Sequence, residues 1–344
     1  MADLAIARIV GGDEGVRGIV GCHPSGVSGG GGCRKGKGID EEIYSWNVLL
    51  ITEGHSRILA RLRKINRIFK QRGWHGEVGE DGPLDDAWNE CSALAEELTD
   101  DQFELFTNLL SNFKKIEPTK IFRSSCRMFE CFLEDSSFRQ RTFVFPIVKK
   151  SDLEKQKPKS SIGIPYYLEH TVAANPKKYK DKEIKFFQSI QELDKIDDFD
   201  IPVNLVLVDD FIGTGDTVDL FIQENQELLD IFDAKIAVVA TACLQEGKEK
   251  IEALGHTVFA EEILPKGIQE NDLLPDKDRA YAIYNEIEAK IKVSPLYKRG
   301  YKQSEALISM VNTPNNTFPI FWYSNRPDGS KWPALFPRRR VHER

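Results

Sequence analysis

The chain has 344 residues, 41% of them hydrophobic and 29% charged, and its formal net charge is −7 at pH 7. A globular chain of this length and composition can bury a full core without disulfides or metal ions. The negative charge argues against a chain-wide surface for nucleic acid, so nucleic acid contact is not indicated beyond a local basic patch.

The cysteine and histidine spacings argue against a structural zinc site. The six cysteines make no C-x-x-C pair, and the six histidines make no H-x-x-x-H pair. Unpatterned cysteines are typical of a reducing compartment. No apolar run reaches the roughly 18–20 residues that span a bilayer, and the first residues lack the pattern of a secretory signal. We therefore expect a cytoplasmic protein with no membrane contact.

The first region, residues 1–38, is rich in glycine. It holds 12 of the 25 glycines, including the run at 29–32, and has neither helical nor strand periodicity. Glycine at this density costs too much backbone entropy to fold without a partner. We predict a disordered tail here; the alternatives are a flexible tether or a loop that cradles a phosphate.

Residues 39–135 are predicted to form a helical extension. Apolar residues recur at helical spacing in a first helix, as at Ile58 and Leu62. Pro83 fits the first turn of a second helix, and Thr99 is a typical cap for a third. The aromatic residues of this region are more typical of a helix–helix core than of a platform that stacks on bases.

From residue 136 to residue 344 the pattern changes to strands that alternate with helices. Short apolar runs rich in β-branched residues predict buried strands, and the amphipathic stretches between them predict helices. The predicted strands are 142–148, 203–208, 236–242 and an edge strand at 257–260, and the predicted helices begin at 160, 219 and 246. This alternation indicates an α/β fold with a parallel sheet and right-handed crossovers.

The most informative junction is residues 208–217, VDDFIGTGDT. In open α/β sheets, ligands bind beyond the carboxyl ends of the strands, where a helix amino terminus offers unpaired N–H groups to a phosphate. Gly213 and Gly215 allow the backbone to approach such a ligand closely, and Thr214 and Thr217 add hydroxyl donors. The loop is therefore predicted to bind a phosphate.

Two acids, Asp209 and Asp210, directly precede this loop. They would repel a lone phosphate, but they can accept hydrogen bonds from the cis-diol of a ribose on the same ligand. A Walker-type loop or a response-regulator acid pair does not fit, because the chain has no G-x-x-x-x-G-K-[ST] and no lysine follows the loop.

The junction resembles the phosphoribosyl pyrophosphate signature of type I phosphoribosyltransferases: four apolar residues, two acids, two further residues and a loop like T-T-G-G-T. The resemblance implies a type I phosphoribosyltransferase-like sheet, with ribose hydroxyls at Asp209 and Asp210 and the 5′-phosphate at residues 213–217. Gly213 departs mildly from the usual threonine or alanine. Asp216 stands where a neutral or basic residue is usual. Its carboxylate is expected to weaken phosphate binding unless it points away, although its backbone N–H can still serve.

Such a transferase also needs a loop for pyrophosphate, and the candidate follows the first strand. Residues 149–159 hold five lysines and end at Lys159 and Ser160, where a helix is predicted to begin. Basic side chains and a helix amino terminus suit a pyrophosphate. A solvated lysine loop is the equal alternative. The resemblance further implies Mg²⁺ between pyrophosphate and ribose oxygens, bound mainly through ligand and water.

A second resemblance lies near the carboxyl terminus, in residues 300–307 and 313–322. These stretches resemble the closing segment of phosphoribosyltransferase-like proteins from bacterial conflict (anti-phage) loci, some of them encoded beside reverse transcriptases as in retrons. Asn315, Asn316 and Thr317 suit either contact with a base or ribose, or a plain Asx turn.

Together the resemblances imply a protein that binds phosphoribosyl pyrophosphate or a nucleotide, as an effector or regulator in a bacterial defence system. If it is an enzyme, it transfers or cleaves at ribose C1, and Asp210 assists the ribose as positive charge develops. The alternative is a non-catalytic module that senses nucleotides. The helical region suits a protein partner, and no acceptor motif is visible.

Overall fold

The computed structural model describes residues 53–74, 85–148, 160–196 and 202–338, and from Glu53 onward the chain forms one compact unit. The predictions for residues 1–38, for Pro83 and for the lysine stretch 149–159 fall outside the described residues.

A parallel sheet of five strands, in the order β3-β2-β4-β5-β6, is the centre of the fold. Its strands are β2 (Arg141–Pro146), β3 (Glu183–Phe186), β4 (Asn204–Ile212), β5 (Lys235–Leu244) and β6 (Thr257–Leu264). Strands β2, β4 and β5 lie inside the sheet, which explains their nearly continuous apolar sequences. The predicted α/β fold with a parallel sheet is confirmed, and the predicted edge strand at 257–260 belongs to β6.

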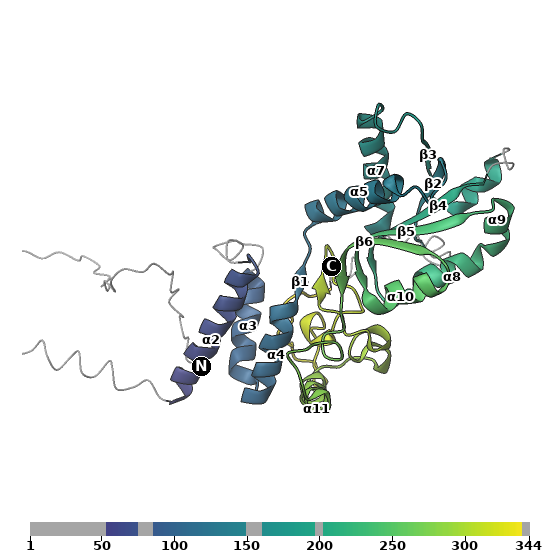
Figure 1. Cartoon of the computed structure of the whole chain (residues 1–344). Coiled ribbons are helices and arrows are strands. Elements are labelled where there is room, and N and C mark those ends of the chain that lie inside the picture. The colour runs from purple at the N-terminus through teal and green to yellow at the C-terminus, as the bar shows by residue number, and fades with distance from the viewer. Residues whose placement is uncertain (1–52, 75–84, 149–159, 197–201, 339–344) are drawn as a thin grey trace, which may run out of the picture. The chain divides into compact units, whose positions relative to one another are not determined.

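Helices cover both faces of the sheet (Figure 1). One face packs against α5 (Pro118–Glu134) and α7 (Gly163–Ala174). The other face packs against three helices: α8 (Asp216–Glu224), α9 (Gln226–Ile231) and α10 (Gln245–Ala253). Side chains of β4 alternate between these cores, with Val206 and Val208 on the α5 side and Leu205 and Leu207 on the α8 side.

A separate apolar core joins the helices before the sheet to the last part of the chain. It contains residues of α2 (Glu53–Gln71), α3 (Asp85–Glu97), α4 (Asp100–Asn112), α11 (Lys277–Glu288) and the segment 307–336. The rings of Phe113 and Phe336 stack with centroids 4.6 Å apart. Strand β1 (Lys114–Lys115) pairs in parallel with β7 (Ile308–Ser309) beside this core. The prediction of helices before the sheet is thus confirmed for the described residues, and the aromatic residues of these helices form a core.

Several boundaries differ from the sequence prediction. Strand β4 continues past residue 208 to Ile212, because Asp209, Phe211 and Ile212 stay paired with β5. The helix predicted to begin at 219 begins at Asp216 and is broken at Asn225, whose side-chain amide donates to the carbonyl of Phe221 at 2.6 Å. Strand β3 and helix α11 were not predicted, whereas α5 lies within the region predicted to be helical, without a predicted start of its own.

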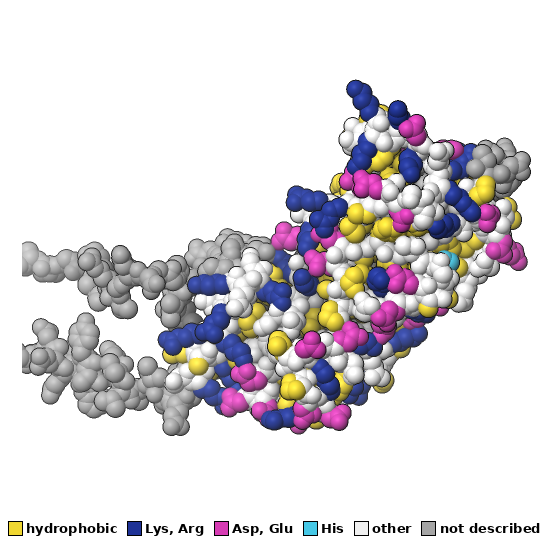
Figure 2. Space-filling view, viewed as in Figure 1, with side chains coloured by type: hydrophobic (Ala, Val, Ile, Leu, Met, Phe, Trp, Pro, Cys, Tyr) yellow, Lys and Arg dark blue, Asp and Glu magenta, His cyan; other side chains and the backbone are white. Residues whose placement is uncertain are grey.

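The remaining elements of the described residues are short 3₁₀ helices. They are η2 (Ser160–Ile162), η3 (Ile190–Lys195), η4 (Pro295–Tyr297), η5 (Tyr301–Gln303) and η6 (Pro319–Phe321). Among the described helices, none is long and apolar enough to cross a membrane. Figure 2 shows acidic and basic side chains interspersed over one face of the molecule, so this face carries no continuous surface of one charge.

Candidate functional site

Asp209 and Asp210 lie in β4 just before its end, and both are partly buried. A carboxylate oxygen of Asp209 accepts the backbone N–H of Asp210 at 2.9 Å. Successive side chains of an extended strand leave opposite faces. A diol that contacts both carboxylates must therefore lie across the carboxyl end of β4, beyond the ends of the strands.

The loop that follows turns sharply into α8. Gly215 has a φ of +77° and is the cap residue of this helix, a left-handed conformation that glycine adopts without steric cost. The first N–H groups of a helix have no partner within it, and those of α8 begin with Asp216. Loop and helix therefore present backbone donors beside the two acids, the arrangement that suits a phosphate.

Three glycines make this loop possible, and Gly247 is one that the sequence analysis missed. It lies in the first turn of α10, where a Cβ would overlap the carbonyl oxygen of Gly213. A Cβ on Gly215 would lie 3.1 Å from the carbonyl oxygen of Gly247. The amino-terminal turn of α10 thus packs directly against the backbone of the predicted phosphate loop.

Asp216 is held by two lysines that sequence analysis did not connect to it. Its two carboxylate oxygens lie 2.8 Å from the ammonium of Lys250 in α10 and 2.7 Å from that of Lys302. Burial acts to raise the pKa of Asp216, but interactions with Lys250, Lys302 and Thr214 outweigh burial and hold the pKa well below its ordinary value. Lys250 also pairs with Asp219 at 2.8 Å. The expected repulsion between Asp216 and a phosphate is therefore offset by two ammonium groups.

The second recognised stretch lies over the same loop. We name residues 299–317 the cover segment. A Cβ on Gly213 would overlap the side-chain amide of Asn316, which is buried and donates to the hydroxyl of Ser304 at 3.2 Å. Thr317 is also buried, and its hydroxyl donates to the carbonyl of Ile308 at 2.6 Å. Asn316 thus belongs to the site, whereas Thr317 holds the cover segment together.

The predicted pyrophosphate residues are only partly placed. Lys159 lies outside the described residues, and Ser160 begins η2. The neighbouring Ser161 is buried and donates its hydroxyl to the carbonyl of Ile147 at 3.2 Å, while η2 contacts β4. The chain therefore returns from residues 149–159 to the same edge of the sheet that holds Asp209 and Asp210.

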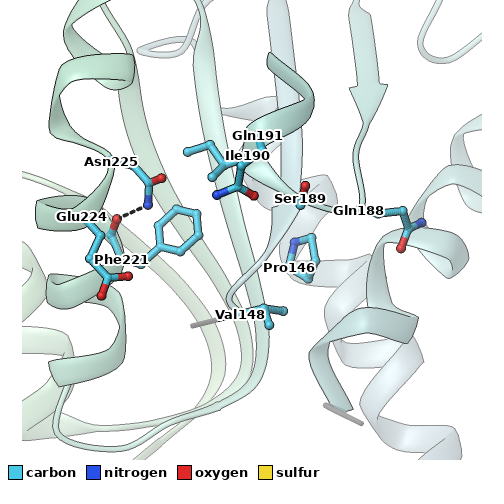
Figure 3. A pocket seen from close by; sticks show the side chains of 9 residues that line it. All are labelled: Pro146, Val148, Gln188, Ser189, Ile190, Gln191, Phe221, Glu224 and Asn225. Atoms are coloured by element: carbon cyan, nitrogen blue, oxygen red, sulfur yellow. Dashed lines mark hydrogen bonds between the residues drawn. The ribbon is translucent and has the colours of Figure 1, made fainter. Parts of the chain in front are cut away.

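A cavity of about 340 Å³ opens beside this edge (Figure 3). The end of α8 forms one wall, and the end of β2 and the chain after β3 form the rest. The described residues that line it are Pro146, Val148, Gln188, Ser189, Ile190, Gln191, Phe221, Glu224 and Asn225. None of these residues carries a positive charge, so the cavity suits a neutral polar group better than a phosphate.

The acid pair fits a magnesium ion only together with a ligand. Within the described ranges, no three His, Cys, Asp or Glu side chains gather as a metal site. Mg²⁺ usually binds through one or two carboxylates plus substrate phosphates and water. If the ion bound here, Asp209 and Asp210 would be the nearby carboxylates, and most of its oxygen ligands would come from a phosphorylated ligand and water.

Solved structures with a similar fold include phosphoribosyltransferases. The orotate phosphoribosyltransferase from Aeropyrum pernix is 11% identical at a TM-score of 0.25, over 41% of this chain and 70% of that one. The xanthine-guanine-hypoxanthine phosphoribosyltransferase of Helicobacter pylori is 11% identical at 0.25, over 46% and 93%. A hypothetical protein from Neisseria gonorrhoeae with bound ppGpp is 14% identical at 0.27, over 49% and 97%. These low scores transfer no residue roles to this chain.

Two sequence comparisons complete the picture. Among curated proteins, none matches the chain. A family model described as PRTase-CE matches residues 96–338, a range that begins in α3 and includes the acid pair, the loop and the cover segment.

Proposed function

The chain belongs to the PRTase-CE family, and from that premise we propose that it binds phosphoribosyl pyrophosphate or a nucleotide at the end of β4. It is a phosphoribosyltransferase-like protein. The observation that carries the proposal is the position of Asp209 and Asp210, directly before a glycine loop that opens α8. This arrangement supports binding of a ribose and its 5′-phosphate together.

In the proposed complex, the backbone N–H groups of residues 213–217 bind the 5′-phosphate, and Thr214 and Thr217 add hydroxyl donors. Asp209 and Asp210 accept hydrogen bonds from the two ribose hydroxyls. Lys159 and Ser160 are proposed to bind pyrophosphate, since η2 begins at Ser160 on the same edge of the sheet. Magnesium, when bound, would neutralise charge on the pyrophosphate oxygens.

If the protein is an enzyme, its reaction is transfer or cleavage at ribose C1. The transition state then carries positive charge on the ribose, and a carboxylate positioned beforehand stabilises that charge. We assign this role to Asp210. The alternative is a module that senses nucleotides without turnover. Release of pyrophosphate from phosphoribosyl pyrophosphate in the presence of a panel of nucleobases would exclude this alternative.

The resemblance of residues 300–322 also leads us to propose a role in a bacterial defence system. Phage plating on cells that carry the intact locus, compared with the locus carrying Asp210→Asn, tests this role. Equal plating on both would contradict a defence function that depends on the site.

The ribose assignment is tested by calorimetric titration of the full chain with ribose 5-phosphate. Asp209→Asn and Asp210→Asn should each weaken binding by about 1.5–3 kcal/mol, the value of a hydrogen bond to a charged group. Inorganic phosphate, which lacks the diol, should bind both variants at least as well as the wild type. Asp230→Asn, an exposed acid in α9, is the matched control for charge. Unchanged affinity for ribose 5-phosphate in both site variants would remove the diol assignment.

A further inference from the structure

We propose that Lys302 is a direct ligand of the phosphate at this site, presented by a strained part of the cover segment and positioned by Asp216. The inference rests on the proposed function of the loop at 213–217 and adds to it a residue from a distant part of the chain. It also gives a role to the stretch beginning at residue 300, which the acid pair and the loop leave without one.

The backbone around Lys302 is the first observation. Arg299, Lys302, Gln303 and Glu305 have φ values between +51° and +58°, and Gly300 has a φ of +85°. Residues other than glycine seldom adopt this left-handed backbone conformation, and several of them in one short stretch are unusual. Such strain persists only where the surroundings fix it, and it gathers at functional sites.

Buried contacts fix this strained backbone. The carboxylate of Glu305 is buried and accepts the N–H groups of Ile268 and Gln269, each at 2.9 Å. It also accepts the hydroxyl of Tyr281 at 2.6 Å. Gly300 packs so closely against the carbonyl of Asn316 that a Cβ there would overlap it. These contacts therefore hold the cover segment in one conformation and fix the position of Lys302.

Charge pairing distinguishes Lys302 from Lys250. The ammonium of Lys250 lies 2.8 Å from a carboxylate oxygen of Asp216 and 2.8 Å from one of Asp219. Lys302 pairs with one acid among the described residues, Asp216, and its side chain is 54% exposed. An ammonium has three donors. Lys302 can therefore donate to a phosphate oxygen while it keeps its ion pair with Asp216.

Asp216 holds the ammonium group of Lys302 next to the proposed phosphate position. Asp216 is the first residue of α8, so the ammonium that it holds stands at the helix end whose N–H groups face a bound anion. Two carboxylates and two ammonium groups cancel in charge within the cluster, so a phosphate approaches a neutral group that contains a spare donor. Asp216 is thus a positioning residue, although its charge alone would oppose binding.

The test is calorimetric titration of the full chain with inorganic phosphate and with ribose 5-phosphate, at fixed ionic strength. Lys302→Ala should lower the affinity for both ligands by about tenfold or more, because one hydrogen bond between charged groups is lost. Lys302→Arg should retain most of the affinity. Lys298→Ala removes the same charge from an exposed lysine four residues earlier and should bind like the wild type.

Lys302→Gly separates binding from folding. Glycine suits a φ of +54°, so this variant should melt at a higher temperature than Lys302→Ala while binding phosphate equally weakly. Wild-type phosphate affinity in both variants would overturn the proposal. So would a loss in Lys298→Ala equal to that in Lys302→Ala, because the effect would then be one of net charge.

The outcomes also separate this inference from the proposed function. If Asp210→Asn weakens ribose 5-phosphate while Lys302→Ala leaves it unchanged, the ribose site stands and the role of Lys302 falls. If Lys302→Ala weakens inorganic phosphate while Asp210→Asn has no effect on ribose 5-phosphate, the phosphate ligand stands and the diol assignment falls. Absence of binding of either ligand to the wild type would contradict both.

Discussion

Gly247 shows how a residue far from the acid pair in sequence shapes the candidate site. Its Cα lies where any side chain would overlap the carbonyl oxygen of Gly213, and no rotation of the side chain relieves an overlap made by Cβ itself. The loop and the first turn of α10 can therefore pack in this way only with glycine at 247.

We expect Gly247→Ala to lower the free energy of unfolding by about 1–3 kcal/mol, as for other overpacked positions, and to weaken ribose 5-phosphate binding. Urea denaturation and calorimetry measure the two effects. Gly163→Ala is the control, because its nearest neighbour, a ring carbon of Phe122, lies 4.0 Å from the added Cβ. A Gly247→Ala variant as stable as Gly163→Ala would mean that α10 moves freely away from the loop.

At the residue level, the sequence identified the candidate site residues that are contiguous and missed those that come from distant positions. Asp209, Asp210 and the loop at 213–217 are contiguous, so a spacing pattern could identify them as a candidate site. Lys250 and Lys302 reach Asp216 from distant positions, and no local pattern marks either lysine. The only feature of the sequence that could have drawn attention to Gly247 is its position as a single glycine in the first turn of a predicted helix.

At the level of elements, the prediction ended β4 too early and α8 began earlier than expected. Acidic residues are disfavoured in strands, so the apolar run suggested an end at residue 208. Pairing with β5 outweighs that preference and continues to Ile212. The consequence for the site is direct, because both acids now stand on a rigid strand rather than on a turn. Lys159 and Ser160 stay predictions as pyrophosphate ligands.

Helix α11 contributes a titratable support for the cover segment. The buried carboxyl of Glu288 accepts the N–H of Arg299 at 2.8 Å and the hydroxyl of Tyr284 at 3.1 Å. Burial raises the pKa of Glu288 above its ordinary value, more than these hydrogen bonds lower it. The folded protein therefore binds a proton at Glu288 more tightly than the unfolded chain does.

The sign of the pH dependence follows from this raised pKa. The stabilising contribution of Glu288 is full below the unfolded pKa of about 4.5 and is lost as pH rises through the higher folded pKa. Relative to Glu288→Gln, the wild type should thus lose free energy of unfolding between pH 4 and neutral pH. Urea denaturation of both proteins across this range measures the difference. A difference that stays constant or grows with pH would show that the carboxyl is ionised without penalty.

At the level of the whole molecule, the α/β class was predictable and the connection between its ends was not. Alternating strand and helix patterns are local, and they identified the parallel sheet. The core shared by α2, α3 and α4 with residues 307–336 brings together parts of the chain about two hundred residues apart. Each part alone shows only an amphipathic pattern, so its partner could not be read from sequence. This shared core is what places the cover segment over the loop.

We propose that the loop at 213–217 binds the 5′-phosphate of a ligand whose ribose contacts Asp209 and Asp210. The most direct test follows the backbone amide signals of the full chain by nuclear magnetic resonance during titration with phosphoribosyl pyrophosphate and Mg²⁺. We predict saturable downfield shifts of the amide protons of residues 213–217, reproduced by ribose 5-phosphate and absent with ribose. Binding that leaves these amide signals unshifted, or that shifts only the signals of residues lining the cavity beside β2, would contradict phosphate binding at this loop.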